Sequence, residues 1–75
     1  MIINWPQYIN TTLGIQCYDS TSTIGKLYGL HTVKGVACLH ILADGCTWTI
    51  PISDIRTVWT LVMDNGPQIP NLTND

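Results

Sequence analysis

The sequence feature that most constrains the fold is the dipeptide Asp44-Gly45, which lies between two apolar-rich runs. This pattern is typical of a two-residue type I′ turn, in which both central residues take a positive φ and the flanking strands pair directly. The turn predicts one apolar face, made by the pairs Ala43 with Cys46, Ile41 with Trp48, Leu39 with Ile50, and Ala37 with Ile52. The other face pairs Leu42 with Thr47, His40 with Thr49, and Cys38 with Pro51. A slip of one residue would mix the two sets, so the pattern favours this register.

A second turn is predicted at Lys34-Gly35, with residues 24–33 as the strand before it. A two-residue loop there places Tyr28 and Leu30 on the apolar face and His31 opposite Cys38. We also expect Trp48 and Trp59 to lie in the core. The glycines within residues 24–33 indicate a bend or a bulge, as where a small sheet curls.

The remaining segments are also predicted to be extended. Residues 13–18 alternate apolar and polar side chains, residues 2–5 form a short edge strand, residues 51–55 form a tight 3₁₀-like turn, and residues 56–63 form a last strand. Residues 64–75 contain two prolines and no periodicity, which predicts an extended or disordered tail. The expected organisation is one small domain over residues 1–63, followed by this tail.

The stretch from Gly25 to Arg56 combines a glycine-punctuated strand, the Asp44-Gly45 turn and the tight turn after Pro51. In this it is similar to SH3-like and Sm-like small barrels. The resemblance implies an all-β fold, a small five-stranded antiparallel barrel, and the composition of the last residues adds a disordered C-terminal tail. Barrels of this kind carry unrelated functions, so the resemblance does not predict an activity.

Charge is scarce in this chain. Only 11% of its 75 residues are charged, against about 25% in typical soluble domains, and three Lys and Arg face five Asp and Glu. A basic stripe for phosphate contacts cannot be built from three cations, which argues against nucleic acid as a partner. No apolar run reaches the ~18 residues of a membrane span, and we expect no membrane association. The three cysteines are too few for a usual secreted disulfide framework, so we expect reduced thiols and a cytoplasmic protein.

Three side chains could carry chemistry on the polar face of the hairpins. His31, Cys38 and His40 project from adjacent strands in the predicted register, and imidazole and thiolate suit Zn²⁺. Cys38 with either histidine as base and Asp54 as orienter also has the residue types of a thiol nucleophile. The simpler interpretation is two half-exposed histidines and a small buried thiol. We therefore expect no enzymatic activity, no cofactor and no metal.

Association with other chains is the favoured hypothesis. A domain this small needs additional stabilisation, and low surface charge removes the usual protection against self-association. We predict a homo-oligomer formed through sheet edges or through the face that carries Val36, Cys38, His40 and Leu42. The aromatic residues expected at a contact surface are Trp5, Tyr8 and Tyr18. The predicted function is non-catalytic binding of another protein, in a chain whose size resembles accessory inhibitors of viruses and mobile elements. The alternatives are an oligomer that sequesters a small molecule and a zinc protein based on His31, Cys38 and His40.

Overall fold

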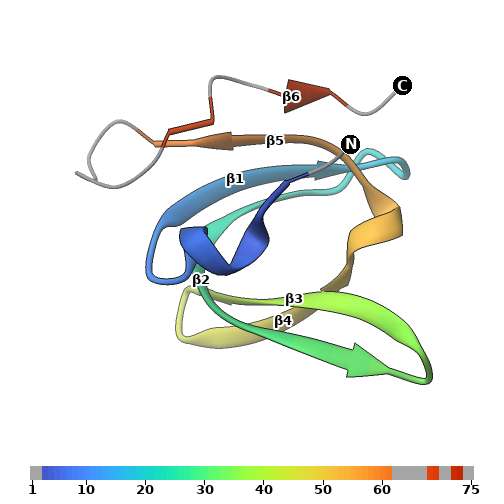
Figure 1. Ribbon diagram of the computed structural model, residues 1–75. Coiled ribbons are helices and arrows are strands. Elements are labelled where there is room, and N and C mark those ends of the chain that lie inside the picture. The colour runs from blue at the N-terminus through green and yellow to red at the C-terminus, as the bar shows by residue number, and fades with distance from the viewer. Residues whose placement is uncertain (1–2, 62–67, 70–71, 74–75) are drawn as a thin grey trace.

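The chain forms one antiparallel sheet of six strands in a computed structural model, which describes residues 3–61, 68–69 and 72–73 (Figure 1). The strands are β1 (Thr12–Cys17), β2 (Ser22–Val33), β3 (Val36–Ala43), β4 (Cys46–Pro51), β5 (Ile55–Thr60) and β6 (Leu72–Thr73), in the order β4-β3-β2-β1-β5-β6. Two short 3₁₀ helices, η1 (Trp5–Tyr8) and η2 (Ile52–Asp54), complete the described elements. The predicted all-β class is confirmed. The sheet curls but does not close, so the predicted five-stranded barrel is not confirmed.

The β3–β4 hairpin has the predicted register from Ala43–Cys46 to Cys38–Pro51. Asp44 and Gly45 have φ values of 52° and 74°, as a type I′ turn requires. The predicted pair of Ala37 with Ile52 does not form, because the chain leaves β4 at Pro51 and Ile52 begins η2. The predicted 3₁₀-like turn is therefore confirmed, and it ends the hairpin one pair early.

The second predicted turn is also confirmed, with φ values of 50° at Lys34 and 79° at Gly35. The prediction for Tyr28 is wrong, however. A register shift between Leu27 and Gly29 places Leu27 opposite Ile41 and leaves Tyr28 on the opposite face. Leu27 is fully buried, whereas Tyr28 is 42% exposed. A bulge adds one residue to one strand, so the side chains on one side of it exchange faces. The glycines in β2 correctly predicted a bulge, but they did not show at which residue it occurs.

The core lies inside the curl of the sheet, where β1, β2, β3 and β5 each contribute at least one fully buried aliphatic side chain. These fully buried side chains are Leu13, Ile15, Leu27, Leu39, Ile41, Ile55 and Val58. The predicted N-terminal edge strand is not observed over Ile3 to Trp5, and Ile2 lies outside the described residues. Instead η1 packs against the core with two aromatic side chains. The Asn10 N–H donates to the Leu27 carbonyl at 2.6 Å, which ties the chain after η1 to β2.

Trp59 does not lie in the core, contrary to expectation. It is partly buried, and its indole lies over Gly14, its cross-strand partner. Gly14 is on the face of β1 opposite to Leu13 and Ile15, and a Cβ at this position would collide with the indole ring. The indole thus takes the place of the side chain that glycine lacks, and it shields the backbone of β1 from water.

The described part of the C-terminal segment is extended against β5, which is one of the two forms expected for the tail. Leu72 pairs with Val58 in β6, and Ile69 is buried in the core cluster. Thr60 fastens this segment: its backbone N–H donates to the Ile69 carbonyl, and its Oγ1 accepts from the Ile69 N–H at 2.8 Å. The same hydroxyl donates to the Gln68 Oε1 at 2.8 Å. The last predicted strand ends at Thr60, and residues 62–63 lie outside the described residues.

Thr60→Val is expected to lower the free energy of unfolding by about 1–3 kcal/mol, because valine has the shape of threonine but leaves the buried Ile69 N–H without an acceptor. Thr57→Val is the matched control on the same strand. Its hydroxyl lies 3.5 Å from that of Thr73 at the surface, and its loss should change stability by less than about 0.5 kcal/mol. Urea unfolding followed by tryptophan fluorescence measures both values. Equal values for the two variants would contradict the role given to Thr60.

Candidate functional site

The outer surface of strands β2 to β4 brings together His31 and His40, which the sequence placed on one face, and Tyr28, which it did not. The rings of His31 and His40 stack with their centroids 4.8 Å apart, and the ring of Tyr28 lies 5.6 Å from that of His40. The Tyr28 hydroxyl donates to the Thr47 Oγ1 at 3.2 Å. His31 is opposite Cys38, as predicted. These contacts make one continuous surface across the three strands.

Exposed apolar side chains surround the histidine pair. Tyr28, Val33, Val36 and Leu42 are 40–45% exposed. Val33 and Val36 pair across the hairpin, and Leu42 is opposite Thr47. We call the surface made by Tyr28, His31, Val33, Val36, His40 and Leu42 the outer face. Its far end lies on the β2–β3 hairpin, which projects from the body of the molecule (Figure 1).

The candidate metal and nucleophile residues do not form a reactive group. Within the described ranges, no three His, Cys, Asp or Glu side chains gather closely enough to hold an ion. Cys38 is 3% exposed, and its Sγ is directed at the Val36 carbonyl oxygen at 3.5 Å. Asp54, the candidate orienter, lines a groove with Cys17, whereas Cys38 and His31 line a different hollow. The structure therefore separates Asp54 from Cys38 and His31.

Two aromatic residues expected on a contact surface are in the core instead. Trp5 and Tyr8 are 8% and 7% exposed, because the turn of η1 directs both side chains onto the sheet. Tyr18 is 53% exposed and therefore lies at the surface. Of the outer-face residues in the prediction, Val36 and Leu42 are exposed and His40 is half-buried, but buried Cys38 is not available.

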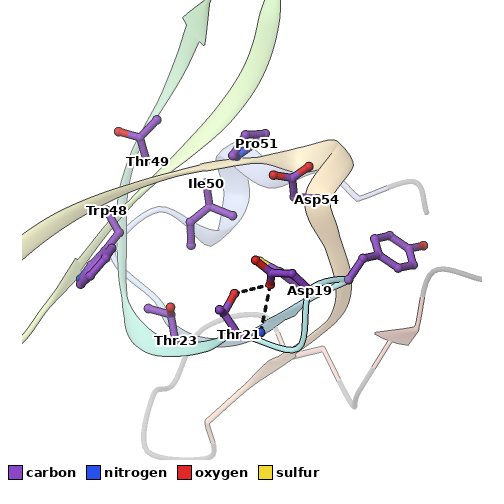
Figure 2. A pocket seen from close by; sticks show the side chains of 10 residues that line it. Asp19, Thr21, Thr23, Trp48, Thr49, Ile50, Pro51 and Asp54 are labelled. Carbon is purple, nitrogen blue, oxygen red and sulfur yellow. Dashed lines mark hydrogen bonds between the residues drawn. The ribbon is translucent and has the colours of Figure 1, made fainter.

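Trp48 was expected in the core but is 52% exposed. It is opposite the buried Ile41, on the inner side of the sheet, but β4 is the edge strand, and no further strand of the described chain covers Trp48 there. Beside it lies a groove of about 430 Å³, between β4 and η2 on one side and the β1–β2 loop on the other (Figure 2). We call this space the β4 groove; its lining residues are Cys17, Tyr18, Asp19, Thr21, Thr23, Trp48, Thr49, Ile50, Pro51 and Asp54.

Figure 2 shows how the side chains alternate along β4. Ile50 and Trp48 point toward the groove, whereas Thr49 points away from it. A second, smaller hollow adjoins the groove at Trp48 and includes Asp44 and Ile24 in its lining. Both hollows are bounded by β4 on one side and by residues 17–24 on the other, so they follow the opening where the sheet fails to close.

The charges along this opening are all of one sign. Every carboxylate side chain in the described part of the chain borders it: Asp19 and Asp54 line the β4 groove, and Asp44 lines the adjoining hollow. The lining of the two hollows includes no lysine or arginine among the described residues. The opening therefore carries a negative potential.

The β1–β2 loop holds Asp19 in a fixed position. Ser20 has a positive φ of 73°, and its N–H donates to the Cys17 carbonyl at 3.0 Å. The Asp19 carboxylate accepts hydrogen bonds from the Thr21 hydroxyl at 2.6 Å and from the Thr21 N–H at 3.0 Å. These bonds hold the pKa of Asp19 below its ordinary value, because they favour the charged form of the carboxylate; the bond from the Thr21 hydroxyl has the larger effect. The carboxylate is therefore ionised at neutral pH.

The thiol in the groove is not an activated nucleophile. Burial raises the pKa of Cys17, and the neighbouring Asp19 and Asp54 raise it further. The protonated thiol therefore dominates at neutral pH. All three cysteines lie within the described residues, and none forms a disulfide.

No protein-family model matches the chain, and neither a curated protein nor a solved structure is significantly similar to it. In the ranges that the structure describes, no helix has both the length and the apolar character needed to cross a bilayer.

Sequence reasoning missed the β4 groove. Trp48 and Ile50 were assigned to the core by their alternation, which places them on the correct face but does not show that this face is uncovered at the edge. The three carboxylates stand at positions 19, 44 and 54 and meet only through the curl of the sheet. The one available signal was local: an aspartate stands two residues before the β4 strand and another shortly after it.

Proposed function

We propose that the protein is a non-catalytic, cytoplasmic interaction protein that self-associates through its outer face and binds another protein. The observation that carries the proposal is the outer face itself, where four large apolar side chains stay 40–45% exposed around a pair of stacked histidines. Contiguous apolar surface of this kind marks interaction sites in soluble proteins. The SH3-like or Sm-like character and the role of an accessory inhibitor form part of the same proposal.

Association through the outer face would bury further apolar surface and so stabilise a small domain. A chain of this length buries only about 60% of the surface of its unfolded form, so its core alone gives limited stability. Apolar area removed from water contributes about 25 cal/mol per Å². Leu42, Val36 and Tyr28 still offer such area, and a second copy would remove it from water.

The charge distribution favours the outer face over the edge of β4 for self-association. In an antiparallel pair of two β4 strands, Asp44 of one copy would approach Asp54 of the other. Like charges placed across an interface oppose pairing. The outer face presents no carboxylate, and the neighbouring charges are those of Lys26, opposite Leu42, and of Lys34 in the hairpin turn. Of the two predicted routes, we therefore favour the mixed face.

The volume of the β4 groove favours one alternative. About 430 Å³ lies within the range of small-molecule sites, and threonine hydroxyls with one indole could hold a neutral ligand. A sequestering protein would keep that ligand through purification. An interaction protein would not need one.

Native mass spectrometry of the purified full chain tests the proposal and the alternative together. We expect masses of two or more times 8.3 kDa, with no added mass from a bound small molecule or metal ion. Light scattering at about 50 μM checks the assembly in solution, because association depends on concentration. A species of 8.3 kDa at that concentration would reject self-association, and a constant added mass on each chain would favour the sequestering function.

A further inference from the structure

We propose that β4 and the β4 groove bind an extended, lysine- or arginine-bearing segment of the partner protein, which adds to β4 as a further strand. This inference rests on the proposed function, since it names the chemistry of the partner that the protein binds. It concerns a different surface from the outer face, and so can be tested separately.

The backbone of β4 is available on one side. Among the strands of the described residues, β4 pairs with β3 alone. In a two-residue hairpin the residues flanking the turn exchange hydrogen bonds, and bonded and non-bonded pairs then alternate. Trp48 and Ile50 therefore bond β3, while the N–H and C=O groups of Thr47 and Thr49 point to the open side. Pro51, which has no N–H, is opposite Cys38 in a pair that does not exchange hydrogen bonds, which agrees with this alternation.

Nothing on β4 protects this edge. Natural edge strands are usually guarded by charged side chains, bulges or early prolines. β4 carries no charged residue, its pairing with β3 is regular, and its proline is the last residue of the strand. No backbone hydrogen bond from elsewhere in the described chain reaches Thr47 or Thr49. Such an edge is a template for an added strand.

The groove provides sites for alternate side chains of that strand. Residues directly opposite one another in an antiparallel pair share a face, so every second side chain of the added strand would lie beside Trp48 and Ile50. Trp48 is half-exposed and can contact either an aliphatic chain or a cation. The aliphatic surface of Ile50 favours an apolar residue at the centre of the segment.

The carboxylates select the charge of the segment. Asp44 precedes β4 and Asp54 follows it, with Asp19 across the groove from the end of the strand. A strand of six residues spans about 20 Å, so basic side chains near both ends of a seven-residue segment would lie near these carboxylates. A second copy of β4 lacks such cations. The fitting occupant is therefore a segment with basic ends and an apolar centre.

A synthetic peptide of this pattern tests the inference on the full-length protein. The probe is Ac-Lys-Thr-Val-Thr-Val-Thr-Lys-NH2, titrated at low salt and followed by the fluorescence of the protein and by amide chemical shifts. We expect binding that weakens with added salt and shifts the Thr47 and Thr49 amides. The peptide with glutamate in place of lysine should bind at least tenfold more weakly, since like charges then meet across the interface. No binding of the lysine peptide at about 1 mM would overturn the inference.

Protein variants separate the backbone from the charges. Thr49→Pro removes an outward N–H without removing a bond to β3, and should weaken binding more than tenfold. Asp19→Asn with Asp54→Asn should weaken it about fivefold, since exposed pairs contribute about 0.2–1 kcal/mol each. Asparagine keeps an acceptor for Thr21, so the loop is retained. Equal affinity for wild type and for both variants would overturn the inference.

Modified peptides provide the control should Thr49→Pro unfold. N-methylation of two threonine amides, which would face β4 in antiparallel pairing, should abolish binding. N-methylation of the two valine amides, which would face away from β4, should leave the binding affinity unchanged. Equal loss with both peptides would overturn the added-strand geometry. Light scattering on the same samples reports assembly independently: an oligomer that fails to bind the peptide refutes this inference alone, and a monomer that binds it refutes self-association alone.

Discussion

Leu42→Glu is expected to convert the proposed homo-oligomer into a monomer of 8.3 kDa without unfolding the chain. Leu42 is 45% exposed within one chain and lies on the outer face beside Thr47 and Tyr28. A glutamate there is hydrated in the monomer, so the fold should tolerate it. Covering the face would bury its charge without a partner, and we expect the dissociation constant to rise on the order of 100-fold or more, corresponding to about 3 kcal/mol.

Ile9→Glu is the matched control for Leu42→Glu. Ile9 is 37% exposed, follows η1 and is not among the residues of the outer face. It undergoes the same change from apolar to acidic and should leave the mass of the assembly unchanged. Light scattering gives the masses, and circular dichroism confirms that both variants are folded. Assembly that survives Leu42→Glu, or that is lost equally in both variants, would contradict the assignment of the outer face.

Gly25→Ala is expected to lower the free energy of unfolding by about 2–3 kcal/mol, near the upper end of the cost of overpacking a core. A Cβ on Gly25 would stand 2.5 Å from the Leu42 carbonyl oxygen and 2.7 Å from the Ile41 Cγ2. The first of these atoms belongs to the backbone of β3 and cannot move without disturbing the sheet. For a chain of this size the loss corresponds to a fall in Tm of about 10–20 °C.

Gly29→Ala provides the comparison on the same strand. A Cβ there would meet only the His40 Cβ at 4.0 Å, an ordinary contact. We expect its free energy of unfolding to stay within about 0.5 kcal/mol of the wild type. Thermal and urea unfolding of the two variants measure the difference. A similar loss for both would show that glycine is needed for its flexibility and not for the close approach of β2 to β3.

The hairpins could be predicted because their information is local. Asp44-Gly45 and Lys34-Gly35 fix the turns, and each turn sets a register that the alternation of side chains then supports. The prediction failed at Tyr28, where the bulge inserts one residue. A bulge depends on how far β2 must bend around the core, and a glycine in the sequence does not tell at which residue the bend falls.

The tryptophans show a second limit of sequence reasoning. Alternation shows which face a side chain takes but not whether another element covers that face. Trp48 lies on the inner side of the sheet, but on the edge strand, where its side chain stays exposed. Trp59 covers Gly14 on the opposite side of the sheet, and Trp5 is buried by the turn of η1. Each outcome depends on elements distant in sequence. The outer face, by contrast, is local to two hairpins, and most of its residues were predicted together.

The most direct test of the outer face is an isotope-filtered NOE experiment on a sample that mixes 13C-labelled with unlabelled chains. It detects only contacts between copies and assigns them to residues. We expect intermolecular NOEs from the methyl groups of Leu42 and Val36 to the aromatic and aliphatic side chains of the outer face of another copy. Intermolecular NOEs confined to Trp48 and Ile50 of β4, or none at all, would contradict self-association through the outer face.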